Sequence, residues 1–184
     1  MAITNVAETG RQLLPITPSE IEGPYYKLRS PERSDLAPGV EGRRVKITGR
    51  VLRPDGKPIP RAILDFWSSD GEVGDYDMAG FAFRGHVFAD QEGRYTVETV
   101  IPACYEPRQA KHLHVKVQGV TRPLTTQLYF SGEPGNRQDR FFHEELEIQL
   151  TVDSAGVRHG AFDFVLPFLT DQENITPASL AAQA

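Results

Sequence analysis

The chain has 184 residues, a formal net charge of -5 at pH 7 and 39% hydrophobic residues, a composition typical of a globular protein that buries its own core. This acidic balance argues against nucleic-acid and anionic-membrane partners, because both require a basic surface. No apolar stretch approaches the roughly 18 residues of a membrane span. The single cysteine, Cys104, excludes an internal disulfide and a cysteine-rich metal site. The start of the sequence carries no export signal, so we expect a cytoplasmic protein.

Residues 1–40 contain a stretch in which proline and glycine recur, EGPYYKLRSPERSDLAPG. This pattern disfavours a helix or a central strand and predicts an extended N-terminal arm. Alternating apolar residues between turn signals then predict strands over 43–53, 61–69, 86–90 and 95–101. The turn QEGR at 91–94 predicts that the last two of these strands form a hairpin.

The second half of the chain continues this pattern, with one short helix expected near 136–145. Further strands are expected over 112–119, 125–131, 144–153 and 160–168. Short strands at regular spacing predict an all-β, single-domain β-sandwich of mixed or antiparallel strands with few short helices. The expected organisation is an arm (1–40) contributing to a pocket or interface, a sandwich domain (41–170) that carries any catalytic site, and a C-terminal tail (171–184).

Two of the five histidines, His112 and His114, stand at the head of the alternating run HLHVKVQG. Side chains at i and i+2 of a strand point to the same face, so both imidazoles should enter one space. Tyr105 precedes this strand, and Tyr76 lies in the glycine-rich loop GEVGDYDMAG. Two imidazoles and two phenols would suit a trivalent iron, because a strong Lewis acid binds phenol as phenolate. The residues alone leave a second interpretation open, namely strand-face histidines beside hydrogen-bonded tyrosines.

The sequence also carries five motifs whose order resembles that of the intradiol ring-cleavage dioxygenases. These motifs are TPSEIEGPYY, GRVLRPDGKPIPRAILDFWSSDGEVGDYD, FRGHVFADQEGRYTVETVIPACY, HLHVKVQG and LTTQLYFSGEP. The resemblance covers roughly residues 17–131 and continues more weakly to about 168. We see no counterpart of the long N-terminal helical domain of the catechol enzymes. On that ground the chain resembles the iron-bearing subunit of protocatechuate 3,4-dioxygenase more than catechol 1,2-dioxygenase.

The resemblance implies the family's β-sandwich fold and a non-haem Fe(III) cofactor. It implies that a catecholic ring is cleaved between its two hydroxyls with O2, to give a cis,cis-muconate-type product. The implied iron ligands are Tyr76, Tyr105, His112 and His114. Tyr105 is also expected to act in catalysis, as an internal base. Family habit leads us to expect a homo-oligomer or pairing with a related subunit.

The arm has an implied role as well. The segment that contains Ile21, Gly23 and Pro24 resembles the part that lines the family's substrate pocket. The neighbouring Tyr25 and Tyr26 are expected either to line this pocket or to pack the arm. A carboxylate on the substrate would need a cation to recognise it, and the sequence offers Lys27, Arg84 and Arg108 as candidates.

One departure from the family pattern concerns the cation near the first histidine. The family usually has an arginine three residues before that histidine, where this chain has Gln109; Arg108 is one residue further away. We expect Arg108 to stabilise anionic intermediates in its place, and Gln127 to hydrogen-bond near the substrate. Lys111 should point to the other face of the strand.

The departure keeps two alternatives open. One is a catalytically silent subunit or a β-sandwich binding module on the same scaffold. The other is a hydrolytic zinc site on the same histidine pair. The two tyrosines disfavour zinc, because zinc sites prefer histidine, cysteine or carboxylate ligands.

Overall fold

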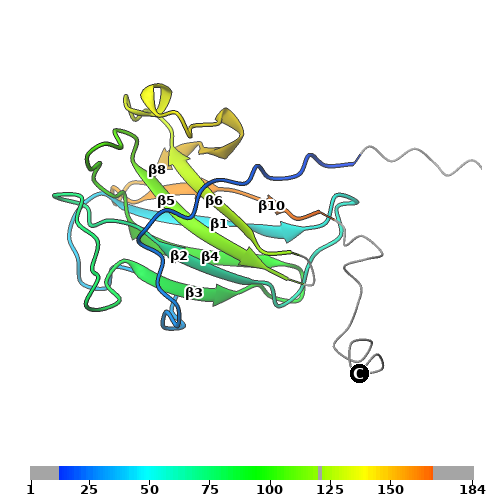
Figure 1. The fold of residues 1–184 in the computed structure, drawn as a ribbon. Coiled ribbons are helices and arrows are strands. Elements are labelled where there is room, and N and C mark those ends of the chain that lie inside the picture. The colour runs from blue at the N-terminus through cyan, green and yellow to red at the C-terminus, as the bar shows by residue number, and fades with distance from the viewer. Residues whose placement is uncertain (1–12, 120–121, 168–184) are drawn as a thin grey trace, which may run out of the picture.

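Two β-sheets face each other in the computed structural model, which describes residues 13–119 and 122–167 (Figure 1). The first sheet has the strand order β3-β2-β5-β6-β7. In that order its strands are Arg84–Phe88, Ile63–Trp67, His112–Gln118, Leu124–Phe130 and Glu147–Ile148. Only the β6–β7 pair in this sheet is parallel.

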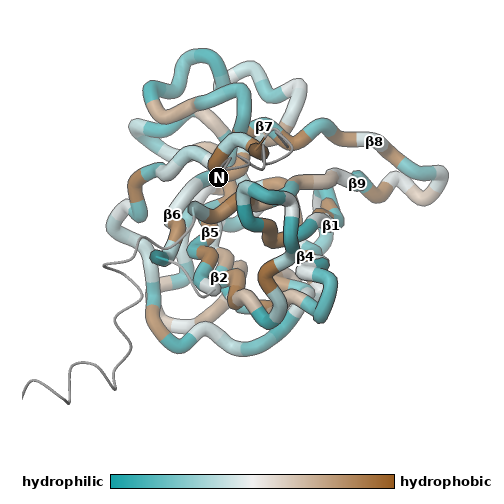
Figure 2. Tube along the Cα trace, turned by 90° about the vertical axis from the view of Figure 1, so that its right-hand side faces the viewer, coloured by the Kyte–Doolittle hydropathy of each residue, from teal (hydrophilic) through white to brown (hydrophobic). Residues whose placement is uncertain are grey.

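The second sheet is built around the long strand β1, Arg44–Leu52. β1 pairs antiparallel with β4 and parallel with β9 and β10, and β8 extends the sheet from β9. These strands are β4 (Arg94–Val100), β8 (Leu150–Val152), β9 (Arg158–Ala161) and β10 (Phe164–Val165). The ribbon formed by β8 and β9 projects from the body of the sandwich (Figure 2).

Alternation along β5 separates the core from the opposite face of the first sheet. Leu113, Val115 and Val117 are fully buried and join the main apolar cluster, which also takes Ile47 and Val97 from the second sheet. His112 and His114 therefore point away from this core, because neighbouring strand residues face opposite sides. The all-β sandwich predicted from the sequence is confirmed.

The hairpin expected over 86–101 is wrong. The turn itself forms, because the N–H of Gly93 donates to the carbonyl of Asp90 and the N–H of Asp90 donates to the carbonyl of Arg94. The two flanking strands then diverge, since β3 pairs with β2 and β4 pairs with β1 in the other sheet. Each strand thereby buries apolar residues between the sheets, Val87 from β3 and Val97 from β4. A local turn pattern does not indicate which sheet each flanking strand joins.

The short helix expected near 136–145 is also different in the structure. Two 3-10 turns form instead, Asn136–Gln138 and Glu144–Leu146. The strand expected over 144–153 is divided into the second of these turns, β7 and β8. The tail predicted over 171–184 lies outside the described residues, and the boundaries at residues 40 and 170 stay predictions.

The described part of the arm crosses the first sheet and reaches the edges of both sheets (Figure 1). It begins beside β10, where the N–H of Thr17 donates to the carbonyl of Val165 and the Thr17 hydroxyl oxygen accepts from the N–H of Val165. It then passes β6, where the N–H of Glu20 donates to the carbonyl of Thr125. It then runs along β3 and β4, where Arg33 donates to His86 and Leu36 donates to Glu98. The arm therefore covers the face of the first sheet that carries the two histidines.

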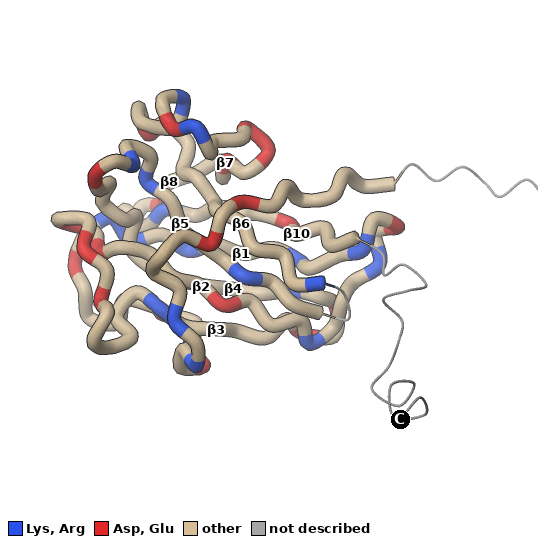
Figure 3. Tube along the Cα trace, in the orientation of Figure 1, with Lys and Arg blue, Asp and Glu red and all other residues tan. Residues whose placement is uncertain are grey.

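Lys and Arg alternate with Asp and Glu over the loops and strand ends of the described trace (Figure 3). Within residues 13–119 and 122–167, no helix is long and apolar enough to cross a membrane.

The core under the histidine strand can be tested with Leu113→Ala. Leu113 is fully buried between His112 and His114, so we expect the substitution to lower the free energy of unfolding by about 2–5 kcal/mol. Val152, which is 62% exposed on β8, provides the control, and Val152→Ala should change stability by less than about 0.5 kcal/mol. Urea unfolding of the metal-free protein measures both. Equal effects of the two substitutions would contradict the assigned core.

Candidate metal centre

Four polar and aromatic side chains form one row across the first sheet, on the face away from the core. Strand register pairs Arg84 on β3 with Trp67 on β2, Trp67 with His114 on β5, and His114 with Gln127 on β6. The Trp67 indole stacks on the His114 imidazole with ring centroids 4.9 Å apart and planes 8° apart. Residues far apart in the sequence therefore meet because antiparallel pairing brings them into register.

The two histidines are buried beside each other, with exposed fractions of 3% for His112 and 2% for His114. Their ring centroids are 4.8 Å apart. The Nδ1 of His112 lies 2.8 Å from the carbonyl oxygen of Ala110. A carbonyl only accepts, so Nδ1 carries the proton and Nε2 keeps its lone pair. This Nε2 has no hydrogen-bond partner among the described residues, and neither has the Nδ1 of His114.

Electrostatics keeps both imidazoles in the form that binds metals. Burial, to which the positive charge of Arg108 adds, lowers the pKa of His112 to about 4. Burial, together with the neighbouring His112, holds the pKa of His114 well below its usual range. Both rings are therefore neutral at pH 7, as a metal ligand must be.

Tyr76 is held by the loop between β2 and β3. Asp70 and Asp77 brace this loop, because their carboxylates accept backbone N–H groups of residues 72–74 and of Gly80 and Ala82. Gly74 has a φ of 84°, and a Cβ there would lie 2.4 Å from the carbonyl oxygen of Cys104. A larger residue at position 74 would thus separate this loop from the segment that carries Tyr105.

The two tyrosines bring the loops and the strand together. The rings of Tyr76 and Tyr105 meet edge to face with centroids 5.5 Å apart, and Tyr105 lies 5.8 Å from the ring of His112. Tyr25 of the arm stacks on Tyr76, with centroids 4.1 Å apart and planes 13° apart. The four ligands expected from the sequence thus form one continuous group of rings, with an arm residue against it.

Burial raises the pKa of the Tyr76 phenol, and the nearby Tyr105 adds to this effect. Burial also raises the pKa of Tyr105. The Tyr76 oxygen is buried without a hydrogen-bond partner in the described residues. Ionising these phenols near neutral pH therefore requires a strong positive charge placed among them.

Arg108 reaches this group in spite of its shifted position in the sequence. A bridge between Tyr105 and Arg108 turns the backbone, so Arg108 is buried while Gln109 is exposed and donates to Glu106. Arg108 pairs with the buried Asp139.

The Arg108 guanidinium continues into a short hydrogen-bond chain. It donates to Oε1 of Gln127 at 2.8 Å. The amide nitrogen of Gln127 donates in turn to the carbonyl oxygen of Ile21 at 3.0 Å. Arg108 and Gln127 are thus joined to the arm segment expected to line the pocket.

That arm segment lies beside the histidines. A Cβ on Gly23, which has a φ of 71°, would be 3.7 Å from Cε1 of His114. Ile21, Gly23 and Pro24 remain exposed, whereas Tyr25 and Tyr26 are partly buried. Tyr26 packs on Trp67 and donates to Asp65, so it belongs to arm packing, while Tyr25 contacts both tyrosine candidates.

The candidate cations for a substrate carboxylate already have partners within the chain. Lys27 and Arg84 donate to backbone carbonyls of the arm and of the Tyr76 loop. Arg108 pairs with Asp139. Lys111 pairs with Glu133, away from the histidines as expected.

The donor set fits a ferric ion better than zinc. Three buried atoms without partners in the described residues belong to Tyr76, His112 and His114, and the phenol of Tyr105 completes the set of four. Within the described ranges, no group of three or more His, Cys, Asp and Glu side chains gathers at a metal-binding distance. Phenolate oxygen suits a trivalent, strongly Lewis-acidic ion, whereas zinc sites favour the residue types that do not gather here.

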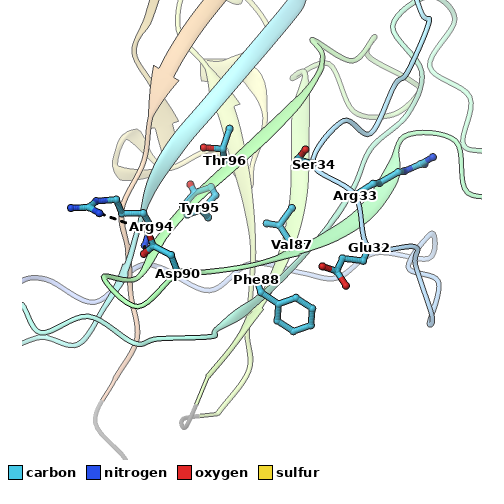
Figure 4. A pocket seen from close by; sticks show the side chains of 9 residues that line it. All are labelled: Glu32, Arg33, Ser34, Val87, Phe88, Asp90, Arg94, Tyr95 and Thr96. Atoms are coloured by element: carbon cyan, nitrogen blue, oxygen red, sulfur yellow. Dashed lines mark hydrogen bonds and ion pairs between the residues drawn. The ribbon is translucent and has the colours of Figure 1, made fainter.

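A surface hollow of about 670 Å³ lies elsewhere (Figure 4). It is lined by residues 32–34 of the arm and by parts of β3 and β4, and it includes none of the proposed ligands. A smaller hollow of about 320 Å³ borders Arg108 and Phe141. The group of buried rings, rather than the size of a hollow, makes this the candidate site.

Trp67 is a neighbour of the site that the sequence analysis did not place there. Tyr25 and Arg84 were expected near the substrate, but not with the contacts that they make to Tyr76 and its loop. Trp67 could have been placed by register, had the partner strands been known. Nothing in the sequence indicates the Tyr25 stack, because the arm crosses the sheet without regular structure.

The family model described as Dioxygenase matches residues 21–166. The dioxygenase domain of a dioxygenase carbohydrate-binding protein fusion from Streptomyces sp. SirexAA-E is 42% identical, with a TM-score of 0.79 over 84% of this chain and 100% of that one. Catechol 1,2-dioxygenase from Acinetobacter baylyi is 29% identical over 67% of this chain and 49% of its own length. The protocatechuate 3,4-dioxygenase beta chain from Burkholderia cepacia is 30% identical over 68% and 65%. The chain spans about half the length of the curated catechol relatives that it matches.

The charge state of the histidines gives a test on the metal-free protein. The folded chain keeps His112 neutral down to about pH 4, whereas an unfolded histidine takes up a proton near pH 6.5. The His112 contribution to the free energy of unfolding should therefore fall as the pH drops from about 6.5 to about 4. NMR titration of the ring should give a midpoint near 4. A midpoint near 6.5 would show that the ring is open to water.

Proposed function

Because the chain belongs to the intradiol dioxygenase family, we propose that it cleaves a catecholic ring between its two hydroxyls with O2 at a non-haem Fe(III) site. The product would be a cis,cis-muconate-type diacid. The observation that carries this proposal is the convergence of His112, His114, Tyr76 and Tyr105 with three buried donor atoms lacking partners.

These four side chains would hold the ferric ion. When bound, Fe(III) supplies Lewis acidity that keeps the phenols ionised, orients the two catechol oxygens and makes the ring reactive towards O2. The neutral imidazoles contribute nitrogen donors without adding charge. The two phenolates offset two of the three positive charges, which lowers the cost of a buried trivalent ion.

The two tyrosines would have different roles. Tyr76 is enclosed by the Tyr25 stack and by its loop, so it would stay in place as a ligand. Tyr105 lies in a partly exposed segment next to Arg108. Its phenolate oxygen would accept a proton from one catechol hydroxyl, which makes it the internal base.

Arg108 and Gln127 would act on the substrate side of the site. Arg108 would place a positive charge near the atoms on which negative charge develops. The pairing with Asp139 and Gln127 holds the guanidinium in one orientation. The bond from Gln127 to Ile21 ties that orientation to the Ile21–Pro24 part of the arm, which would line the pocket.

The described cations favour a catechol without a ring carboxylate. Lys27, Arg84 and Arg108 all donate to groups of the chain itself. A buried carboxylate without a partner would lose more free energy on desolvation than it regains. A substrate without a carboxylate differs from what the resemblance to the protocatechuate group implies. The comparisons do not distinguish the protocatechuate group from the catechol group. Oligomer formation, pairing with a related subunit and a cytoplasmic location stay predictions.

The ferric site can be tested by absorption spectroscopy. Loading the purified protein with Fe(III) should give a broad visible charge-transfer band, and anaerobic addition of catechol should move it to longer wavelength. Tyr76→Phe and Tyr105→Phe should each change or abolish the band, because each removes a phenolate. Tyr26→Phe is the matched control and should keep it, since Tyr26 bonds to Asp65. A loaded protein that stays colourless would overturn the proposal.

Substrate choice gives a second test. Oxygen uptake should be faster with catechol than with protocatechuate, with kcat/KM higher by about tenfold or more, because Lys27, Arg84 and Arg108 already have partners within the chain. A preference for protocatechuate would contradict the proposal that the substrate lacks a ring carboxylate. It would leave the proposed ring-cleavage activity unaffected. A charge-transfer band without turnover on any catechol would instead favour the silent-subunit alternative.

A further inference from the structure

Arg84 is a fully buried cation, with an exposed fraction of 1%. None of its hydrogen-bond partners in the described part of the chain is a carboxylate. The guanidinium donates to the carbonyl oxygen of Tyr25 at 2.7 Å and to that of Asp77 at 3.3 Å, and it lies 3.6 Å from the sulfur of Met78. Burying a cation on carbonyl dipoles is costly, so this side chain needs an explanation other than the stability of the sandwich.

The two carbonyls that accept from Arg84 lie in the two segments whose tyrosine rings stack on each other, the arm and the Tyr76 loop. Tyr25 carries the first carbonyl and its ring stacks on Tyr76, with centroids 4.1 Å apart. Asp77, which follows Tyr76 directly, carries the second. The guanidinium itself lies 5.8 Å from the centroid of the Tyr76 ring. Arg84 thus joins the arm and the loop at the point where their rings meet.

The planar fork of arginine suits this task. Its nitrogens donate in fixed directions from one rigid plane, so two carbonyls held by one guanidinium cannot move independently. Arg84 is itself fixed by the strand pairing of β3 with Trp67 of β2. Its carbonyl also accepts from Nε of Arg33 at 2.8 Å. The position of the stacked pair is therefore set from the rigid sheet.

We propose that Arg84 is a positioning residue for Tyr76, acting by clamping the carbonyls of Tyr25 and Asp77 so that the Tyr25–Tyr76 stack is held against the histidine pair. The inference rests on the proposed function, because it assigns Tyr76 as an iron ligand. Partners that orient metal ligands commonly change metal affinity 10- to 100-fold when removed. The arm then contributes to the metal site through Tyr25 as well as to the substrate pocket.

Arg84→Met tests the clamp, because methionine fills much of the space without donating. We expect ferric affinity to fall about 10- to 100-fold and the charge-transfer maximum of the remaining complex to move, with kcat reduced more than KM. Arg44→Met is the matched control. Arg44 also ties the arm to a strand, through the carbonyl of Ala37 and the carboxylate of Asp35, but away from Tyr76. It should change neither affinity nor spectrum.

Tyr25→Leu separates positioning from folding, because it removes the stacked ring and leaves the carbonyl that Arg84 clamps. It should reproduce much of the Arg84→Met effect, and the double variant should be only slightly worse than either single one. The proposal would be overturned by any of three results. These are additive losses of ferric affinity in the double variant, a charge-transfer band in Arg84→Met that matches the parent's, or a shift of that band in Arg44→Met as large as in Arg84→Met. If Arg84→Met fails to fold, Arg84→Lys replaces it, because lysine offers no rigid fork for two carbonyls.

A parent protein that never binds ferric iron would overturn the proposed function, not the clamp. Hydrogen exchange of the metal-free protein then decides, comparing residues 71–83 in the parent, Arg84→Met and Arg44→Met. Faster exchange there in Arg84→Met alone supports the clamp, and equal rates in all three reject it.

Discussion

The strand register of the first sheet is the constraint on which the site depends. β2, β5 and β6 pair so that Trp67, His114 and Gln127 lie side by side on one face, while Leu113 and Phe66 anchor the same strands in the core. A slip of one residue would turn both histidines into the apolar interior. The free energy of core packing thus also sets the position of the two nitrogen donors.

The remaining donors come from irregular segments, so the fold has to hold them by other means. The Tyr76 loop is braced by its own aspartates, by the close approach of Gly74 to Cys104 and by contacts from the arm. The Tyr105 segment is braced by the Arg108 bridge and the Asp139 pair. In the proposed site a rigid sheet would thus provide two ligands and the loops bound to it the other two. In such an arrangement a loop tyrosine could move while the histidines stay fixed.

Much of the fold and of the candidate site could be predicted from the sequence, but some elements were predicted better than others. Alternation in HLHVKVQG was enough to predict that His112 and His114 share a face, because a strand has a period of two. The same local logic failed for residues 86–101, where a good turn joins strands of different sheets. Which sheet takes each strand depends on contacts across the core, and these are not visible in a local pattern.

The surroundings of the site show the same limit. Arg108 rather than Gln109 is buried because the backbone turns after Tyr105, which the spacing alone left open. The sequence made Arg84 a candidate for binding a substrate carboxylate. Its hydrogen bonds to the carbonyls of Tyr25 and Asp77, which support the proposed positioning role instead, are visible only in the structure. Likewise the motif around Gly23 indicated a pocket, whereas the Tyr25 stack required the path of the arm.

In the proposed site, side chains from three separate segments converge on one ferric ion. The most direct measurement is a crystal structure of the iron-loaded protein, with anomalous diffraction recorded at the iron edge. We expect one strong anomalous peak within coordination distance of Nε2 of His112 and of the phenol oxygens of Tyr76 and Tyr105, with His114 as the fourth ligand. A peak held by carboxylates elsewhere, or tyrosines that remain turned away from bound iron, would contradict it.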